Sequence, residues 1–149
     1  MADLVCTISE TVTLNGSLRG SVNTLTTTGI NDIFERIVTC TASVATTIGV
    51  FAALPSTSPG AIDVSRTKYV RVTNLETAVT IELAVVTTAS NYQVTIRPGA
   101  SHILFSGDVV ALGEEDTTPS FGTMENLASL QVKPTTVATA RVELLVGLE

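Results

Sequence analysis

The sequence predicts a single all-β domain, an antiparallel β-sandwich of jelly-roll type with about eight to ten strands. Three observations predict this fold. Apolar and polar residues alternate with period two in one segment after another, which is the pattern of half-buried strands. Turn-forming residues recur about every eight to twelve residues, and no segment keeps a helical period. Thr and Val recur throughout, and β-branched residues favour a pleated sheet.

The first strand is expected in residues 4–14, where most even positions are apolar, so that the strand is half-buried. The dipeptide Asn15-Gly16 follows, and it favours a type I′ hairpin turn because both central residues of that turn need positive φ. The expected return strand contains the apolar residues Leu18, Val22 and Leu25. Residues 4–26 are therefore predicted to form a long N-terminal β-hairpin that acts as a contact arm.

The rest of the chain divides into short strands separated by turns and loops. Residues 29–32 are expected to form a turn or a short helical corner, and residues 55–60 a loop. Pro98-Gly99 predicts a type II turn, because Pro fixes φ at one central position and Gly supplies a positive φ at the next. Residues 113–126 are polar and rich in turn formers, which predicts the longest loop. Strands are expected at 37–40, 48–51, 68–75, 79–85, 92–96, 103–105, 109–112, 127–132 and 142–148.

The size and polarity of the chain predict one domain that belongs to an assembly. Its 149 residues correspond to one domain with one core, so residues 1–149 are treated as a single β-sandwich domain. Charged residues make up only 15% of the chain, hydrophobic residues 44%, and the mean hydropathy is +0.42. A free monomer usually carries more surface charge, so we expect neighbouring subunits to cover part of the exterior. A large core beneath a Thr-coated surface is the alternative interpretation.

The net charge of the chain disfavours two classes of partner. The formal net charge is −6, the pI is about 4.6, and the eight Lys and Arg residues are scattered singly. Because binding to nucleic acid or to an anionic membrane surface needs clustered basic residues, we expect neither partner. The apolar runs are too short to cross a bilayer. Residues 1–4 lack the basic region of a signal peptide, so none is expected.

The sequence contains no pattern that predicts catalysis, so we expect the protein not to be an enzyme. His102 is the only histidine, and it lies in a strand-like run. A catalytic zinc site usually needs several His or Cys ligands, and neither a nucleophile elbow nor a phosphate-binding loop is present. The acidic run Glu114-Glu115-Asp116 lacks the alternating acids and the glycine of a calcium-binding loop. We therefore expect no metal and no cofactor.

The two cysteines are expected to be structural thiols. Cys6 and Cys40 each lie among strand-like residues, and neither belongs to a CxxC motif. A disulfide between them would require neighbouring strands, and whether they are neighbours is left open. Unpaired thiols fit synthesis in a reducing cytoplasm.

Two stretches of the chain resemble small β-sandwich structural proteins of tailed bacteriophages, namely decoration, cement or tail-associated subunits. Residues 14–36 read LNGSLRGSVNTLTTTGINDIFER, and residues 68–108 contain KYVRVTNLE, VTIEL and IRPGASHILFSGD. The resemblance extends loosely over the whole chain and consists of turn and strand phrases. It implies a virion component that is assembled in the host cytoplasm, and it carries over no catalytic residue.

The same resemblance implies contacts with the major capsid protein or with other virion subunits, and a homo-oligomer, with a trimer favoured. A decoration subunit stabilises a shell by burying apolar surface across junctions between shell subunits. Exposed strand edges can also pair with an extended arm of a neighbour. The expected contact elements are the N-terminal hairpin and the loop at 113–126. The contact residues predicted within them are Leu4, Val5, Leu18, Val22, Glu114, Glu115, Asp116 and Phe121.

Two other functions remain as alternatives. The first is a tail, fibre or collar subunit that contacts host glycans, although the chain has no Trp on which a sugar could stack. Tyr69 and Tyr92 are the aromatic candidates for stacking, and both are expected to pack within strands. The second alternative is a non-viral β-sandwich binding module.

Overall fold

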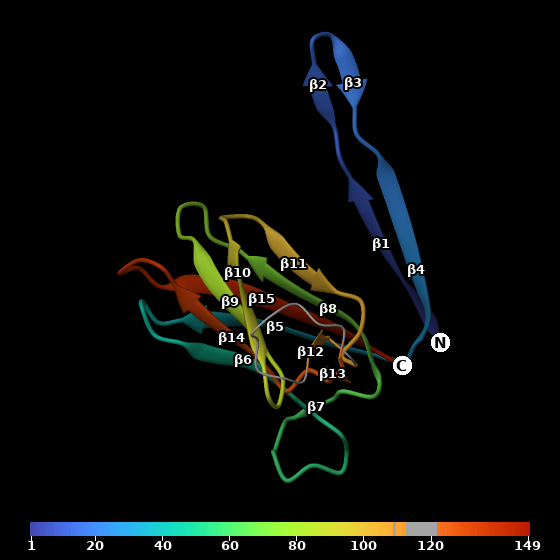
Figure 1. Cartoon of the computed structure of the whole chain (residues 1–149), viewed down its shortest axis with the longest axis vertical. Helices are drawn as coiled ribbons and strands as arrows, with labels where there is room; N and C mark the ends of the chain where they lie inside the picture. Colours follow the sequence, from blue (N-terminus) through green and yellow to red (C-terminus); the bar gives the residue numbers. More distant parts are fainter. Residues whose placement is uncertain (109, 113–121) are drawn as a thin grey trace.

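The computed structural model of the chain describes residues 1–108, 110–112 and 122–149, and it consists of strands without helices in these ranges. Two sheets pack face to face into a sandwich, and a long hairpin projects from one end of it (Figure 1). One sheet has the order β10-β9-β14-β6-β7 and the other β11-β8-β15-β5. The strands of the first sheet are β6 (Thr46–Ala52), β7 (Ile62–Asp63), β9 (Ile81–Val86), β10 (Asn91–Ile96) and β14 (Ser129–Pro134). Those of the second are β5 (Asp32–Cys40), β8 (Thr67–Asn74), β11 (Ser101–Leu104) and β15 (Ala140–Leu148).

The connectivity of the sandwich is that of a jelly roll. Apart from the two-residue strand β7, the four strands of each sheet pair antiparallel to their neighbours. The chain crosses between the sheets at each step from β5 through β6 and β8 to β9, and β15 returns to lie between β5 and β8. Eight antiparallel strands in this order form the two Greek keys of a jelly roll. The predicted fold class is therefore confirmed.

The core lies between the two sheets and follows the predicted alternation. In β8 the side chains of Val70 and Val72 point inward, and in β15 Val142 and Leu144 do the same, whereas their chain neighbours face outward. Burial of such aliphatic side chains stabilises the fold by about 1.5–3 kcal/mol each. Apart from Leu127, which lies just before β14, the fully buried large side chains come from strands of both sheets: Ile48, Ile81, Leu83, Leu130, Leu144, Val70, Val72, Val85, Val132, Val142 and Val146.

The predicted turn at Pro98-Gly99 is also confirmed. Gly99 has a φ of +73°, which favours glycine, and the amide of Ala100 donates to the carbonyl oxygen of Arg97 at 3.0 Å. This turn connects β10 of one sheet to β11 of the other. It thereby positions His102 on β11 opposite Tyr92 on β10, between the two sheets.

The N-terminal hairpin projects from the sandwich and does not form part of either sheet (Figure 1). Its inner half pairs β1 (Ala2–Ser9) with β4 (Val22–Ile30), and its outer half pairs β2 (Val12–Leu14) with β3 (Ser17–Arg19). We call residues 1–30 the arm and its outer part, residues 11–20, the tip. The arm leaves the sandwich close to the C-terminus, and the tip is the point of the arm farthest from the sandwich (Figure 1).

Two expectations about connecting segments need correction. Residues 29–32 form neither a turn nor a helical corner, because Gly29 and Ile30 complete β4 and Asp32 begins β5, which leaves only Asn31 between them. The amide of Asn31 donates to the carbonyl oxygen of Leu148 at 2.8 Å, so β15 holds the junction between β4 and β5 in place. The loop expected at 113–126 contains the short strand β13 (Met124–Glu125), which pairs with β12 (Ala111–Leu112). Most of the remaining loop lies outside the described residues.

Candidate functional site

The arm is held in shape by its turn and by one close backbone approach. Asn15 and Gly16 have φ values of +49° and +76°, which confirms the predicted type of hairpin turn. Halfway along the arm, the amide of Glu10 donates to the carbonyl oxygen of Ser21 at 2.9 Å, and Gly20 packs directly against Glu10. The paired strands of the arm therefore run from its base to its tip, with irregularities at this point and between Ala2 and Leu4 at the base.

The arm exposes large aliphatic side chains on both of its faces. Val5 and Thr26 face each other across the two inner strands, and Cys6 and Leu25 do so on the opposite face. Leu18 is 74% exposed and Val22 is 66% exposed. A two-stranded hairpin with such side chains in water is marginally stable by itself. The exposed aliphatic residues of the arm are Val5, Ile8, Val12, Leu14, Leu18, Val22 and Leu25.

Only the base of the arm packs against the sandwich. A Cβ atom added at Gly147 would lie 3.0 Å from Cδ1 of Leu4 and 3.5 Å from Cδ1 of Ile30, so the absence of a side chain in β15 makes room for the arm. The hydroxyl of Tyr69 lies 3.9 Å from Sγ of Cys6. Burial and the neighbouring Cys6 raise the pKa of Tyr69. Leu4 and Cys6 are consequently half-buried.

These positions qualify the expectations for the hairpin. The return strand and the turn are confirmed, but the expectation of a half-buried first strand is wrong beyond Cys6, because no second layer of the described chain covers it. Of the predicted contact residues, Val5, Leu18 and Val22 are exposed on the arm, and Leu4 packs at its base. The other predicted contact residues, Glu114, Glu115, Asp116 and Phe121, lie outside the described residues. The contact role of all eight residues stays a prediction.

A groove lies at the base of the arm, beside the start of β5. Its volume is about 420 Å³, and it is formed by the first residues of β5, the loop before β7, the turn after β7 and the end of β15. The side chains of Ile33 and Leu54 in this groove are exposed. We call this feature the groove, and its lining residues are Asp32, Ile33, Phe34, Leu54, Gly60, Ala61, Ile62, Asp63, Arg66 and Leu148.

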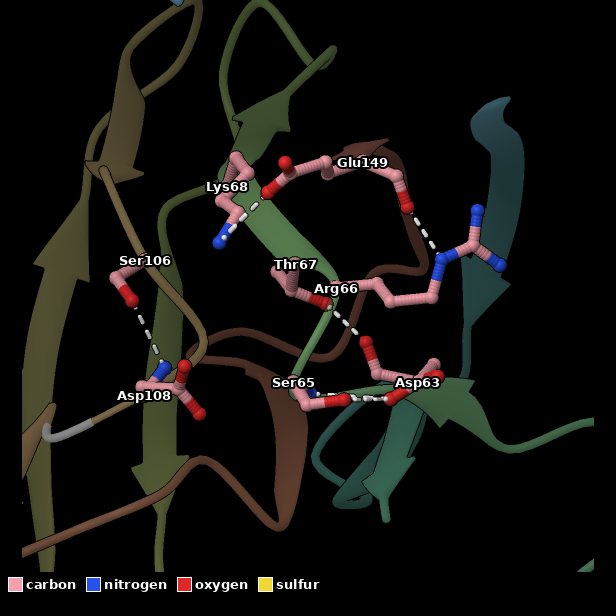
Figure 2. Close-up of polar contacts among 8 residues, drawn as sticks. All are labelled: Asp63, Ser65, Arg66, Thr67, Lys68, Ser106, Asp108 and Glu149. Atoms are coloured by element: carbon pink, nitrogen blue, oxygen red, sulfur yellow. Dashed lines mark hydrogen bonds and ion pairs between the residues drawn. The ribbon is translucent and has the colours of Figure 1, made fainter. Parts of the chain in front are cut away.

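Polar contacts fix the rim of the groove (Figure 2). The carboxylate of Asp63 accepts hydrogen bonds from the Ser65 hydroxyl at 2.7 Å and from the Ser65 amide at 3.1 Å. The Ser65 hydroxyl bond, followed by smaller backbone and Arg66 contributions, lowers the pKa of Asp63. Arg66 Nε donates to the backbone carbonyl of Glu149, while the side chain of Glu149 pairs with Lys68 at 3.0 Å. The hydrogen bonds from Ser65 therefore favour the ionised form of Asp63. The neighbouring Arg66 already has a partner in the backbone of Glu149.

Sequence reasoning did not find the groove. Asp32 and Asp63 are 31 positions apart in the chain, and neither belongs to a motif that would link them. Both residues line the groove because β5 begins at Asp32 and β7 ends at Asp63, and these two strand ends lie at the same end of the sandwich. The only sequence signal was the short spacing of Asp63 and Ser65, which is typical of a turn stabilised by its own side chains.

His102 packs against Tyr92 between the two sheets. Its Nε2 lies 3.3 Å from the hydroxyl of Tyr92, and the two rings meet edge to face with centroids 6.1 Å apart. Burial lowers the pKa of His102 and raises that of Tyr92. The pair thus joins β11 of one sheet to β10 of the other.

Within the described residues, no three His, Cys, Asp or Glu side chains are grouped so that they could hold a metal ion. In the same ranges, no helix is long and apolar enough to cross a membrane. No protein-family model matches the chain, and a search of curated protein sequences finds no match.

Proposed function

We propose that the chain is a structural subunit of a bacteriophage virion, a capsid decoration or cement protein that stabilises the shell through contacts made by its arm. The observation that carries this proposal is the arm itself. It projects from the sandwich (Figure 1). It exposes aliphatic side chains on both faces, with Val5 and Val22 on one face of its inner half and Ile8 and Leu25 on the other. Contiguous apolar surface of this kind is typical of a protein–protein interface.

The energetics of the arm favour a bound state. Each large aliphatic side chain contributes about 1.5–3 kcal/mol when it is fully removed from water. Part of this gain offsets the entropy lost when the arm is ordered against a partner, which is of the order of 1 kcal/mol per side chain. Because a shell carries many copies of a decoration subunit, even a modest net gain per copy adds up to substantial stabilisation of the particle.

The jelly-roll scaffold and the low charge of the chain also support this function. Viral capsid proteins and lectins both use the jelly-roll architecture, but a fold alone does not identify a function. The distinction therefore rests on the surface. Beyond the arm, Ile33 and Ile37 on the edge strand β5 are exposed, which adds apolar surface on the sandwich.

The test uses capsid shells of the phage that encodes the chain, purified without this subunit. We expect the wild-type protein to sediment with the shells and to raise their melting temperature in calorimetry. The double variant Leu18→Asp/Val22→Asp should lose most of this binding, because a carboxylate would be buried in an apolar interface. Val137→Asp is the matched control, since Val137 is an exposed aliphatic residue outside the arm.

Three outcomes would contradict the proposal. The first is a failure of the wild-type protein to bind shells, and the second is binding that survives the double change in the arm. The third is binding to purified tails or to a glycan array instead, which would favour a tail subunit or a lectin-like protein.

A further inference from the structure

We propose that the tip of one copy binds in the groove of a second copy of the same chain. The inference rests on the proposed function and names one partner of the arm. It joins two surfaces that have no partner within the described chain and that lie at opposite ends of the arm.

The tip combines apolar side chains with a single cation. Arg19 is the only charged residue in the segment 11–20. It lies directly opposite Val12 on the paired strand, so that the two side chains share one face of the tip with Leu14. Among the described residues, no ion pair involving Arg19 is found. The tip therefore presents an unpaired guanidinium between exposed aliphatic side chains.

The groove has the complementary chemistry. Ile33 and Leu54 supply exposed apolar surface, and Asp32 and Asp63 supply two carboxylates at its edge. The cation already present there, Arg66, donates to the backbone of Glu149. Its volume of about 420 Å³ lies within the range of about 300–1,000 Å³ that is typical of binding pockets. A guanidinium flanked by aliphatic side chains matches this arrangement, because planar Arg binds carboxylates with well-defined geometry.

The geometry requires two copies. The groove lies at the start of β5, next to the base of the arm. From Ile30 to Asn15 the arm is about 50 Å long if strands rise by about 3.3 Å per residue. Figure 1 shows the arm pointing away from the sandwich. A straight arm cannot return its tip to its own groove. The contact is thus head-to-tail. Such a contact generates a closed ring if successive rotations bring the last copy back to the first, and an open filament if they do not.

The first experiment uses two single variants of the full chain. Leu14→Asp places a carboxylate on the face of the tip that carries Arg19, and Leu54→Asp places one in the groove. Each variant by itself should be monomeric in light scattering and sedimentation velocity, whereas the wild-type protein should self-associate. Mixing the two should give a one-to-one heterodimer and nothing larger, because one intact tip meets one intact groove and the other pair is blocked. Val137→Asp is again the control and should associate like the wild type.

The second experiment tests the charge pairing. Arg19→Asp and Asp32→Arg should each weaken self-association by about tenfold or more, since each places like charges together. The double variant should recover most of the loss. This experiment also guards against misfolding, because a variant that merely failed to fold would not be rescued by a second substitution.

Several results would overturn the inference. They are a wild-type protein that stays monomeric at concentrations on the order of 0.1 mM, association that neither aspartate substitution changes, and a charge swap without recovery. A monomer that nevertheless binds shells through Leu18 and Val22 would overturn this inference and leave the proposed function standing. Self-association through the groove without any binding to shells would overturn the proposed function and leave this inference standing.

Discussion

A Cβ atom added at Gly20 would lie 1.9 Å from the carbonyl oxygen of Glu10, closer than any side chain can approach. Gly20 also has a φ of +128°, a conformation that residues with a side chain rarely adopt. This contact lies between the inner and outer pairs of strands in the arm, next to the hydrogen bond from Glu10 to Ser21. The path of the arm from the sandwich to the tip therefore depends on glycine at this position.

We expect Gly20→Ala to disrupt the outer half of the arm without unfolding the sandwich. Trypsin should then cleave after Arg19 faster than in the wild type, while the thermal unfolding of the sandwich stays unchanged, because local and global stability are separable. Gly16→Ala is the matched control. Its Cβ would meet no atom within 4 Å, so only the positive φ opposes it, at about 1–2 kcal/mol. Equal cleavage of Gly20→Ala and the wild type would contradict this expectation.

A pair of leucine variants should separate folding from binding. Leu130 is completely buried between the sheets, and Leu18 is exposed on the tip. Leu130→Ala is expected to lower the free energy of unfolding by about 2–5 kcal/mol, through lost burial and the cavity left behind. Leu18→Ala should change it by no more than about 0.5 kcal/mol but should weaken binding to shells. Denaturant unfolding and co-sedimentation measure the two effects, and a large loss of stability in Leu18→Ala would contradict the assignment of the arm as a contact element.

The contrast between these two leucines also shows what could be predicted from the sequence. Alternation identified the inward side chains of the sandwich, such as Val70 and Leu144, because a strand between two layers must place alternate residues on opposite faces. The same alternation in residues 4–14 predicted a half-buried strand. In residues 4–14 the alternation shows which side chains are apolar. It does not show whether a second layer covers them, because that depends on long-range packing.

The groove shows a second kind of limit. The turn at Asn15-Gly16 could be predicted because its conformation depends on the two residues themselves. Asp32 and Asp63 come together only through the order of the strands in the two sheets, and no local rule gives that order. The pairing of Arg19 with these carboxylates is accordingly an inference from the structure.

Acid should destabilise the protein as the pH falls through the folded pKa of its hydrogen-bonded carboxyl groups. The backbone amide of Arg141 donates to Oε1 of Glu76 at 2.9 Å, and its guanidinium donates to the same oxygen at 3.2 Å. These bonds lower the pKa of Glu76 below 4.5, its ordinary value, because they favour the ionised form. The carboxyl group therefore stabilises the fold above about pH 4.5, and this contribution is lost at lower pH.

The measurement is the thermal midpoint of the wild type and of Glu76→Gln between about pH 7 and pH 3. We expect the difference between them to be largest near neutral pH and to shrink in acid, since protonated Glu76 resembles Gln. Glu82→Gln is the control, because its carboxylate is 3.8 Å from Lys133 on an exposed surface, where an ion pair contributes little. A difference that stays constant with pH would show that the Glu76 charge does not stabilise the fold.

The two cysteines should differ sharply in their reactivity towards a thiol reagent. Cys40 is completely buried at the end of β5, and burial raises the pKa of its thiol, so that little reactive thiolate forms. Cys6 is half-buried at the base of the arm, on the outer side of the sheet that contains Tyr69. Along β15, Cys40 pairs with Ala140 at one end while the arm packs on Gly147 near the other, so the two thiols are too distant to form a disulfide.

We therefore expect one thiol to react quickly in the folded protein and the second only on unfolding. Mass spectrometry after labelling should locate the first label on Cys6, and Cys6→Ser should remove it. Because Cys40 becomes accessible only when the sandwich opens, its labelling rate should rise with denaturant in parallel with global unfolding. Labelling of Cys6 should slow when the arm binds its partner, if binding restricts the motions that expose the base of the arm. Rapid labelling of Cys40 in the folded protein would contradict the placement of β5 against the core.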